Sequence, residues 1–304
     1  MALETVRDIT AGLWQRRDPR VRHQLLQASP SLVLAVLAAY LLLVRYGPRL
    51  MKNRQTPNLT LAMAAYNVLQ VTLSAYMMRE FIVSRPQRVI CAVVDVSENP
   101  VSKRLADACW LFHISKAVDF LDTVFLVLKK DNKRLTYLHV FHHASMFFSY
   151  YIATLFSPGG ASWLGCALNC FVHCVMYGYY FLAALGPAVR RHLWWKRYLT
   201  QLQMIQFSII LLHIISMRLP GLRCGAPLWA GAMTFVYLLV LTGLFLNFYM
   251  RSYRGDAKRQ SGEPKPRAAS TEVTTSTPVK KQKHLPLIWR MLQTHGLGCF
   301  HQND

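Results

Sequence analysis

The sequence predicts an all-α, polytopic membrane protein with seven transmembrane helices. Three observations point to this class. The chain of 304 residues is 53% hydrophobic, and its mean hydropathy is +0.21. It also contains a succession of long apolar stretches with few charges. A bilayer core of about 30 Å needs roughly 20 apolar residues in a helix, and most of the stretches approach that length.

The apolar stretches give the expected spans, with bounds that a sequence defines only to within a few residues. In chain order they are 31–46, 60–83, 107–128, 137–157, 162–184, 199–217 and 228–250. The first span is short and the third contains charge, so either is a candidate for a tilted or partly re-entrant segment. We expect one membrane domain over 31–250, a lumenal segment over 1–30, and a basic cytosolic tail over 251–304. The tail is rich in Ser, Thr, Pro and Lys, a composition typical of disorder.

The charges of the loops predict the orientation, because Lys and Arg are enriched in cytosolic loops. One set of connections carries twelve of them: Arg45, Arg49, Lys52, Arg54, Lys129, Lys130, Lys133, Arg134, Arg190, Arg191, Lys196 and Arg197. The opposite set carries six: Arg85, Arg88, Lys103, Arg104, Arg218 and Arg223. The first set is therefore expected in the cytosol and the N-terminus in the lumen, although the N-terminal segment carries five arginines of its own.

The cysteines divide by location. Cys91 and Cys224 fall in loops that this orientation makes lumenal, where disulfides persist, so we predict a bridge between them. Four others lie in apolar segments and are expected to be packing residues: Cys109, Cys166, Cys170 and Cys174.

The chain is strongly basic, with 35 Lys and Arg against 14 Asp and Glu and a net charge of +21. In a soluble protein this excess would suggest nucleic acid. Here the basic residues lie mostly between apolar segments and in the tail, and no nucleic-acid-binding motif occurs. We therefore expect no nucleic acid partner. The placement suits an anionic membrane surface or a phosphorylated ligand that approaches from water.

Residues 139–143 read His-Val-Phe-His-His inside the fourth span. Imidazoles at membrane depth are costly unless they have partners or water. In a helix, positions i, i+3 and i+4 share a face, so His139, His142 and His143 point the same way. We expect the chemistry of the protein at this cluster.

Three further spans carry polar stripes at helical spacing. They are Lys116, Asp119 and Thr123 with Asp122 at the edge; Asn169, His173 and Tyr177; and Thr200, Gln203 and Gln206. Each alone has a structural explanation: a buried ion pair can be purely structural, a single buried His is commonly a packing residue, and amides join membrane helices. Four polar stripes on four spans predict one shared interior pocket.

Several chemistries compete for the histidine cluster. A di-metal oxygenase would need further histidine boxes, which the chain lacks. A zinc site from His139, His143 and His173 is conceivable, without a clearly placed carboxylate. The third use needs no metal: imidazole acts as nucleophile and general base and forms a reactive acyl-imidazole from a thioester. A condensing enzyme based on Cys170 and Cys174 is a further alternative. A seven-span receptor or transporter is another, but it leaves the clustered histidines unexplained.

Taken together, the boxes resemble the very-long-chain fatty acid elongase family, the animal and fungal 3-ketoacyl-CoA synthases. They are KxxDxxDT at 116–123, HxxHH at 139–143, NxxxHxxMYxYY at 169–180 and TxxQxxQF at 200–207. Four boxes in this order are highly specific and cover most of spans three to six. The chain departs from the family at Asp119, where the box usually has Glu, so the carboxylate is kept one methylene shorter.

The resemblance implies that the chain condenses a long-chain or very-long-chain fatty acyl-CoA with malonyl-CoA in the endoplasmic reticulum membrane, releasing CO₂ and CoA without a cofactor. It implies that six of the seven helices form a barrel around a narrow acyl tunnel. The implied partners are acyl-CoA, malonyl-CoA, the lipid bilayer, further copies of the chain, and the reductase and dehydratase enzymes of the elongation cycle.

The resemblance also assigns roles. His142 is the implied acyl acceptor and His173 faces it across the tunnel, while His139, His143 and His173 serve as base, orienter or enolate stabiliser in an order left open. Asp119 and Asp122 would set imidazole tautomers. The expected substrate-binding residues within the spans are Lys116, Asn169, Tyr177, Thr200, Gln203 and Gln206, of which Asn169, Gln203 and Gln206 would donate to the developing oxyanion. The cations expected at the CoA phosphates are Lys129, Lys130, Lys196, Arg197, Arg251 and Arg254, and the positive-inside rule explains each of these equally well.

Overall fold

A computed structural model of the chain describes residues 12, 14–97, 99–219, 224 and 228–260, with the backbone alone over 253–260. The chain divides into two units, Met1–Met250 and Arg251–Asp304, and the packing described below belongs to the first. The described residues form helices and their connections without any strand, which confirms the all-α class.

The helices follow the predicted spans closely. In chain order they are α2 (Pro30–Met51), α3 (Thr60–Val83), α4 (Pro100–Val118), α5 (Phe120–Leu128), α6 (Tyr137–Phe156), α7 (Ser162–Ala184), α8 (Pro187–Arg190), α9 (Lys196–Ser216) and α10 (Leu228–Gln260). Among the described residues, five helices are long and apolar enough to cross a membrane, namely α2, α3, α7, α9 and the part of α10 up to Ser252. A multi-pass membrane protein is thereby confirmed, and the number seven stays a prediction.

The segment predicted as one span over 107–128 contains two helices, α4 and α5, separated by Asp119 alone, and that they form a single span stays a prediction. α4 begins earlier, at Pro100, because the Asn99 side chain accepts a hydrogen bond of 2.9 Å from the backbone amide of Val101 and caps the helix. The helix ends at Val118, Asp119 forms a turn, and α5 starts at Phe120. Because α4 contains charged residues near both of its ends, it is less apolar than the helices that are apolar enough to cross a membrane. At the other end of the chain, α10 extends ten residues beyond the predicted end at 250.

The start of α6 is set by Thr136. Its hydroxyl accepts a hydrogen bond of 3.2 Å from the backbone amide of His139, the pattern of an N-capping threonine. The cap fixes the helical register, so that His139 lies in the first turn and His142 and His143 in the second.

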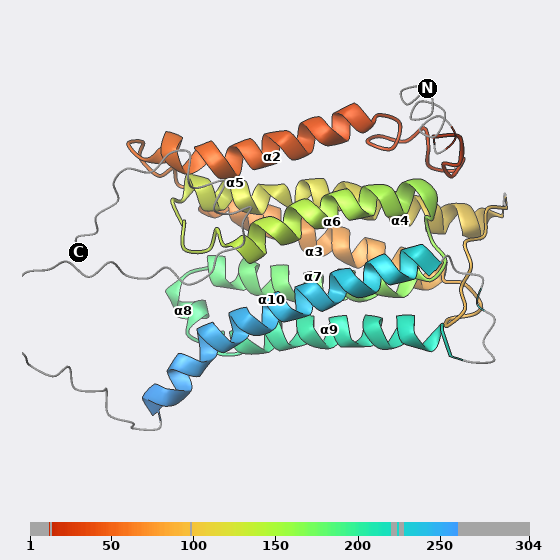
Figure 1. Ribbon diagram of the computed structural model, residues 1–304. Coiled ribbons are helices and arrows are strands. Elements are labelled where there is room, and N and C mark those ends of the chain that lie inside the picture. Colours follow the sequence, from red (N-terminus) through yellow and green to blue (C-terminus); the bar gives the residue numbers. More distant parts are fainter. Residues whose placement is uncertain (1–11, 13, 98, 220–223, 225–227, 261–304) are drawn as a thin grey trace, which may run out of the picture. The chain divides into compact units, whose positions relative to one another are not determined.

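Neighbouring helices in the first unit form a continuous series of contacts (Figure 1). α3 packs along α7, and α7 packs against α9. α9 meets α10 at Phe207 and Phe245, whose ring centroids are 5.2 Å apart. α10 reaches α6 through Tyr237 and Ser145, whose hydroxyl oxygens are 2.9 Å apart. α6 packs against α4, and α4 against α3, while α2 packs on α5 and α6.

The two ends of this helix bundle differ. At one end Cys91 and Cys224 form a disulfide with their Cα atoms 4.9 Å apart, joining the α3–α4 and α9–α10 connections. We call this the disulfide end. We call the opposite end, which carries the α2–α3, α5–α6 and α7–α9 connections, the basic end.

Large apolar side chains cover the outside of the bundle. On α2, Leu34 is 57% exposed, and on α10, Met233 is 64% exposed. Exposed apolar surface of this extent is stable where lipid replaces water. The outer faces of α2 and α10 therefore suit a bilayer.

Candidate active site

Three imidazoles come together on α6. The ring centroids of His139 and His143 are 4.4 Å apart, and those of His142 and His143 are 5.5 Å apart with the rings at 89°. All three side chains are half-buried. The ring of His142 also lies 6.4 Å from that of Phe245 on α10. The cluster is thus on a shared face that points to the interior of the bundle.

His139 is oriented by a residue of α5. The Thr123 hydroxyl, which is fully buried, lies 2.8 Å from Nε2 of His139 and 3.4 Å from the Tyr40 hydroxyl. A threonine hydroxyl that donates to Tyr40 accepts from the imidazole, which would place the His139 proton on Nε2. Thr123 therefore fixes the orientation of this ring.

Lys116 and Asp119 form a buried ion pair at the junction of α4 and α5. Nζ of Lys116 lies 3.1 Å from Oδ2 of Asp119 and donates to Oδ1 of Asn169 at 3.2 Å. The other carboxylate oxygen, Oδ1, accepts a hydrogen bond of 2.6 Å from Nε2 of Gln70. Because both oxygens of Asp119 are engaged, the arrangement suits a fixed counter-charge better than a proton acceptor. Asn169 likewise uses its oxygen on Lys116, which leaves its amide hydrogens for other partners.

Asp122 joins the same network through Tyr177, whose hydroxyl also lies 3.5 Å from Oδ1 of Asp119. The Tyr177 hydroxyl donates to Oδ2 of Asp122 at 2.6 Å and lies 3.5 Å from the Tyr66 hydroxyl. The His173 ring stands edge-on to Tyr177, with centroids 5.5 Å apart. Tyr177 thus connects His173 on α7 with Asp122 on α5, although no hydrogen bond joins the histidine to the carboxylate directly among the described residues.

Sequence reasoning missed two residues of this network, Tyr66 and Gln70 on α3. Gln70 donates to the Tyr66 hydroxyl at 3.0 Å as well as to Asp119, and both side chains are buried. Together with Ser74, also buried, they form an i, i+4, i+8 stripe in the second span. The same spacing criterion that identified the other four stripes would have found this one.

The α9 stripe is less connected. Thr200 and Gln206 are buried, and Nε2 of Gln203 lies 3.9 Å from Sδ of Met176 on α7. Within the described part of the chain, no hydrogen bond joins these three side chains to the α6 histidines. Their roles as substrate or oxyanion ligands stay predictions.

The cations predicted for phosphate binding divide by location. Lys129, Lys130, Lys196 and Arg197 are exposed and belong to the basic end. Arg251 is exposed and belongs to the second unit, and the Arg254 side chain lies outside the described residues.

The alternatives based on metal and thiol chemistry involve side chains of α6 and α7. Among the described residues, no group of three or more His, Cys, Asp or Glu is arranged to hold a metal ion. Cys170 is 1% exposed within an apolar cluster of α3, α4 and α7. Cys174 is half-buried, with its Sγ 3.6 Å from the backbone oxygen of Val71.

Comparisons with known proteins agree with the boxes. The model of the ELO family, described as GNS1/SUR4, matches residues 25–261. Very long chain fatty acid elongase 4 of Homo sapiens is 36% identical over 275 residues, covering 90% of this chain and 86% of the relative. Elongase 7 of Rattus norvegicus is 38% identical over 78% of this chain and 85% of the relative. Elongase 2 of Rattus norvegicus is 38% identical over 265 residues, covering 86% of this chain and 93% of the relative. The chain belongs to the ELO (GNS1/SUR4) family, whose members matched here are very long chain fatty acid elongases.

Proposed function

We propose that the chain is a 3-oxoacyl-CoA synthase. Its family membership supports an enzyme of fatty acid elongation that uses acyl-CoA substrates at a membrane. In the proposed reaction it condenses a long-chain or very-long-chain fatty acyl-CoA with malonyl-CoA to give 3-ketoacyl-CoA, CO₂ and CoA. The observation that carries this proposal is the His139–His143 cluster, which faces the bundle interior.

The first proposed step transfers the acyl group to His142. An imidazole nitrogen attacks the thioester carbonyl, the C–S bond breaks, and the imidazole proton passes to the CoA thiolate that leaves. In an environment with little water, the acyl-imidazole that results is protected from hydrolysis. His143, whose ring stands edge-on to that of His142, and His139 are placed to accept or relay this proton.

The second step forms the carbon–carbon bond. Malonyl-CoA loses CO₂ and becomes an enolate, whose carbon attacks the acyl-imidazole carbonyl. The C–N bond to His142 breaks, and the imidazole takes one proton from the medium, which balances the reaction. The enolate and the oxyanion carry negative charge, so Lys116 supplies a nearby fixed positive charge, and Asn169 offers its amide hydrogens. Asp119, whose other oxygen accepts from Gln70, holds Lys116 in place.

The membrane arrangement that we propose has seven spans, of which six surround an acyl tunnel. The contact series α3, α7, α9, α10, α6 and α4 returns to α3, and α2 lies outside it, which supports a six-helix barrel. We propose that the protein resides in the endoplasmic reticulum membrane with the basic end in the cytosol and the disulfide end in the lumen. We further propose self-association and cooperation with the reductases and dehydratase that process the product.

The test of this function is a condensation assay with protein purified in detergent. Wild-type protein should convert acyl-CoA and labelled malonyl-CoA to 3-ketoacyl-CoA, and His142→Ala should lose at least about 10³-fold in rate because the nucleophile is absent. Mass spectrometry after incubation with acyl-CoA alone should find the acyl group on His142. His192→Ala, which removes an exposed histidine of the α8–α9 connection, is the matched control and should retain full rate.

Two outcomes would assign the chemistry elsewhere. Wild-type rate in His142→Ala contradicts the nucleophile assignment, and loss of rate in a Cys170→Ser, Cys174→Ser variant would favour a thiol. We propose that no metal takes part, so treatment with a chelator should leave the rate unchanged. Loss of rate restored by added zinc contradicts that part of the proposal.

A further inference from the structure

Asp119 lies in the turn between α4 and α5, and side chains from three helices contact its carboxylate. Nζ of Lys116 on α4 donates to Oδ2 at 3.1 Å. Nε2 of Gln70 on α3 donates to Oδ1 at 2.6 Å, and the Tyr177 hydroxyl on α7 lies 3.5 Å from the same oxygen. Asp119 is 3% exposed, so these groups replace water as the partners of its charge.

Gln70 makes the shortest of these contacts, and its amide nitrogen is held on two sides. Nε2 also donates to the Tyr66 hydroxyl, with the two heavy atoms 3.0 Å apart, and the Gln70 side chain is buried. Since an amide nitrogen carries two hydrogens, each hydrogen of Nε2 has a partner, and a rotation of the amide would break both contacts. The Asp119 carboxylate therefore has a fixed donor on a neighbouring helix.

The length of the side chain at position 119 makes this donor important. The chain has Asp where the box of the elongase family usually has Glu. The carboxylate of Asp ends one carbon–carbon bond, or about 1.5 Å, closer to the backbone. Gln70 already lies at hydrogen-bond distance from Oδ1, so a carboxylate that extended one methylene further in the same direction would overlap its amide. The lengths of the two side chains are thus complementary.

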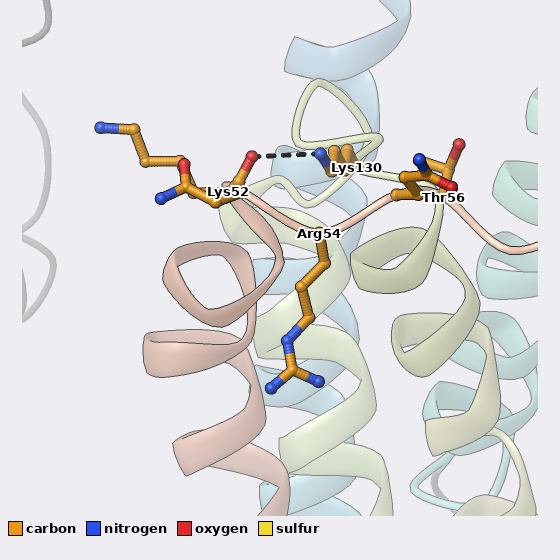
Figure 2. Close-up of a pocket in the computed structure, with 6 residues that line it drawn as sticks. Lys52, Arg54, Thr56 and Lys130 are labelled. Carbon is orange, nitrogen blue, oxygen red and sulfur yellow. Dashed lines mark hydrogen bonds between the residues drawn. The ribbon is translucent and has the colours of Figure 1, made fainter.

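The Asp119 carboxylate in turn determines where the Lys116 ammonium lies. Lys130 at the basic end, labelled in Figure 2, is exposed to solvent. Lys116 is 2% exposed, so its ammonium depends on protein partners, namely Asp119 and Oδ1 of Asn169 at 3.2 Å. Because Gln70 fixes one oxygen of the carboxylate, the other oxygen stays directed at Lys116.

The charge of Lys116 acts on the histidine site. It interacts electrostatically with the rings of His142 and His173, and its partner Asn169 lies on α7 together with His173. An enolate and an oxyanion form at this site in the proposed reaction, and a positive charge that is already in place stabilises both. Displacing the ammonium would therefore slow the reaction without changing how tightly the acyl chain binds.

We propose that Gln70 is a positioning residue of the condensation reaction, an inference that rests on the proposed function. Gln70 does not touch the reacting atoms. It fixes the short carboxylate of Asp119, and this carboxylate holds the Lys116 ammonium where negative charge develops. Helix α3 thereby supplies the reach that the shorter acidic residue lacks.

The principal variant is Gln70→Leu, which replaces the amide with an apolar side chain one atom shorter. The kcat of condensation should fall at least about tenfold, the effect of one lost hydrogen bond to a charged group, with little change in the KM for acyl-CoA. Gln201→Leu is the matched control. It removes an amide that donates to the Tyr249 hydroxyl at 2.8 Å, and it should retain the wild-type kcat.

A rescue experiment tests the pairing with Asp119. Asp119→Glu alone should also lower kcat about tenfold, because the longer carboxylate meets the Gln70 amide. In the double variant Asp119→Glu, Gln70→Leu the longer carboxylate has room, and the Tyr66 hydroxyl that Gln70 no longer occupies is free to donate to it. The kcat of the double variant should return to within about threefold of wild type, whereas independent effects would multiply to a loss of about 100-fold.

Thermal unfolding of the same four proteins in detergent separates the pairing from the reaction. The double variant should unfold at a higher temperature than either single variant, whether or not the protein condenses substrates. If wild type forms no 3-ketoacyl-CoA, the proposed function fails and the role of Gln70 in the reaction fails with it, while the unfolding temperatures still report the pairing.

Two results would overturn the inference and leave the proposed function standing. The first is an active enzyme in which Gln70→Leu retains the wild-type kcat. The second is a double variant whose loss of kcat equals the product of the two single losses, because Gln70 then does not act through Asp119. All rates are measured at a temperature at which each variant is folded. Gln70→Met, which keeps the length of the side chain without its amide, replaces Gln70→Leu if the leucine variant does not fold.

Discussion

The two ends of the helix bundle use charge in opposite ways. At the disulfide end, Arg20 pairs with Asp18 at 2.6 Å and donates to the backbone oxygen of Pro158 at 3.3 Å. Glu80 near the end of α3 is bonded to Arg104 of α4 and pairs with Arg79. At the basic end, the α2–α3, α5–α6 and α7–α9 connections contain one carboxylate, Asp131, which pairs with Arg134 at 2.7 Å.

This difference indicates that the charges at the two ends of the bundle have different roles. Arg20 and Asp18 are 9% and 2% exposed at their side chains, so their charges are satisfied by each other and by backbone groups rather than by water. They show how one of the five N-terminal arginines is accommodated at an end with few basic loops. The basic end keeps its cations exposed, where they add little stability but attract anions. One end holds the helices together, and the other is available to a charged substrate.

The largest expected effect is at the disulfide. Replacing both Cys91 and Cys224 by Ser opens a link between residues 133 apart in sequence, and should lower the free energy of unfolding by about 2–5 kcal/mol. Thermal unfolding in detergent, followed by circular dichroism, measures it. Cys174→Ser is the control for thiol removal and should have a much smaller effect. Identical unfolding temperatures for the double variant and wild type would show that the disulfide end does not depend on its cross-link.

The next effect concerns the arginine that connects the N-terminal segment to the bundle. Arg20→Ala leaves Asp18 buried without its partner and should lower the free energy of unfolding by about 2–4 kcal/mol. Arg191→Ala, at an exposed position of the basic end, should change it by less than about 0.5 kcal/mol. Comparable losses for the two variants would contradict the proposed difference between the ends.

The smallest expected effect is that of salt. Raising the ionic strength from 0.1 M to 1 M shortens the Debye length from about 10 Å to about 3 Å. The electrostatic interactions of exposed charges are therefore weakened more than those of buried ion pairs. The KM for acyl-CoA should therefore rise several-fold, while the unfolding temperature of the protein stays nearly constant. The reverse pattern would place the salt-sensitive charges at the disulfide end.

The sequence by itself determined the class of the protein and the residues of its candidate site. Apolar length and helical periodicity are local properties, so they predicted the helices and placed His139, His142 and His143 on one face. Loop charge grouped the connections into two sets, and the two cysteines of the less basic set, Cys91 and Cys224, are joined in the structure. The order and spacing of the four boxes indicated the family that the comparisons show.

Only the tertiary structure decided which helix completes each interaction. Gln70 contacts Asp119 across 49 residues of sequence, and Lys130 contacts the oxygen of Lys52 across 78. Such contacts depend on which faces of separate helices and loops meet, and periodicity within one helix carries no information about that. The left-handed backbone of Lys130 also depends on tertiary context, because the surrounding structure holds a conformation that local preference disfavours.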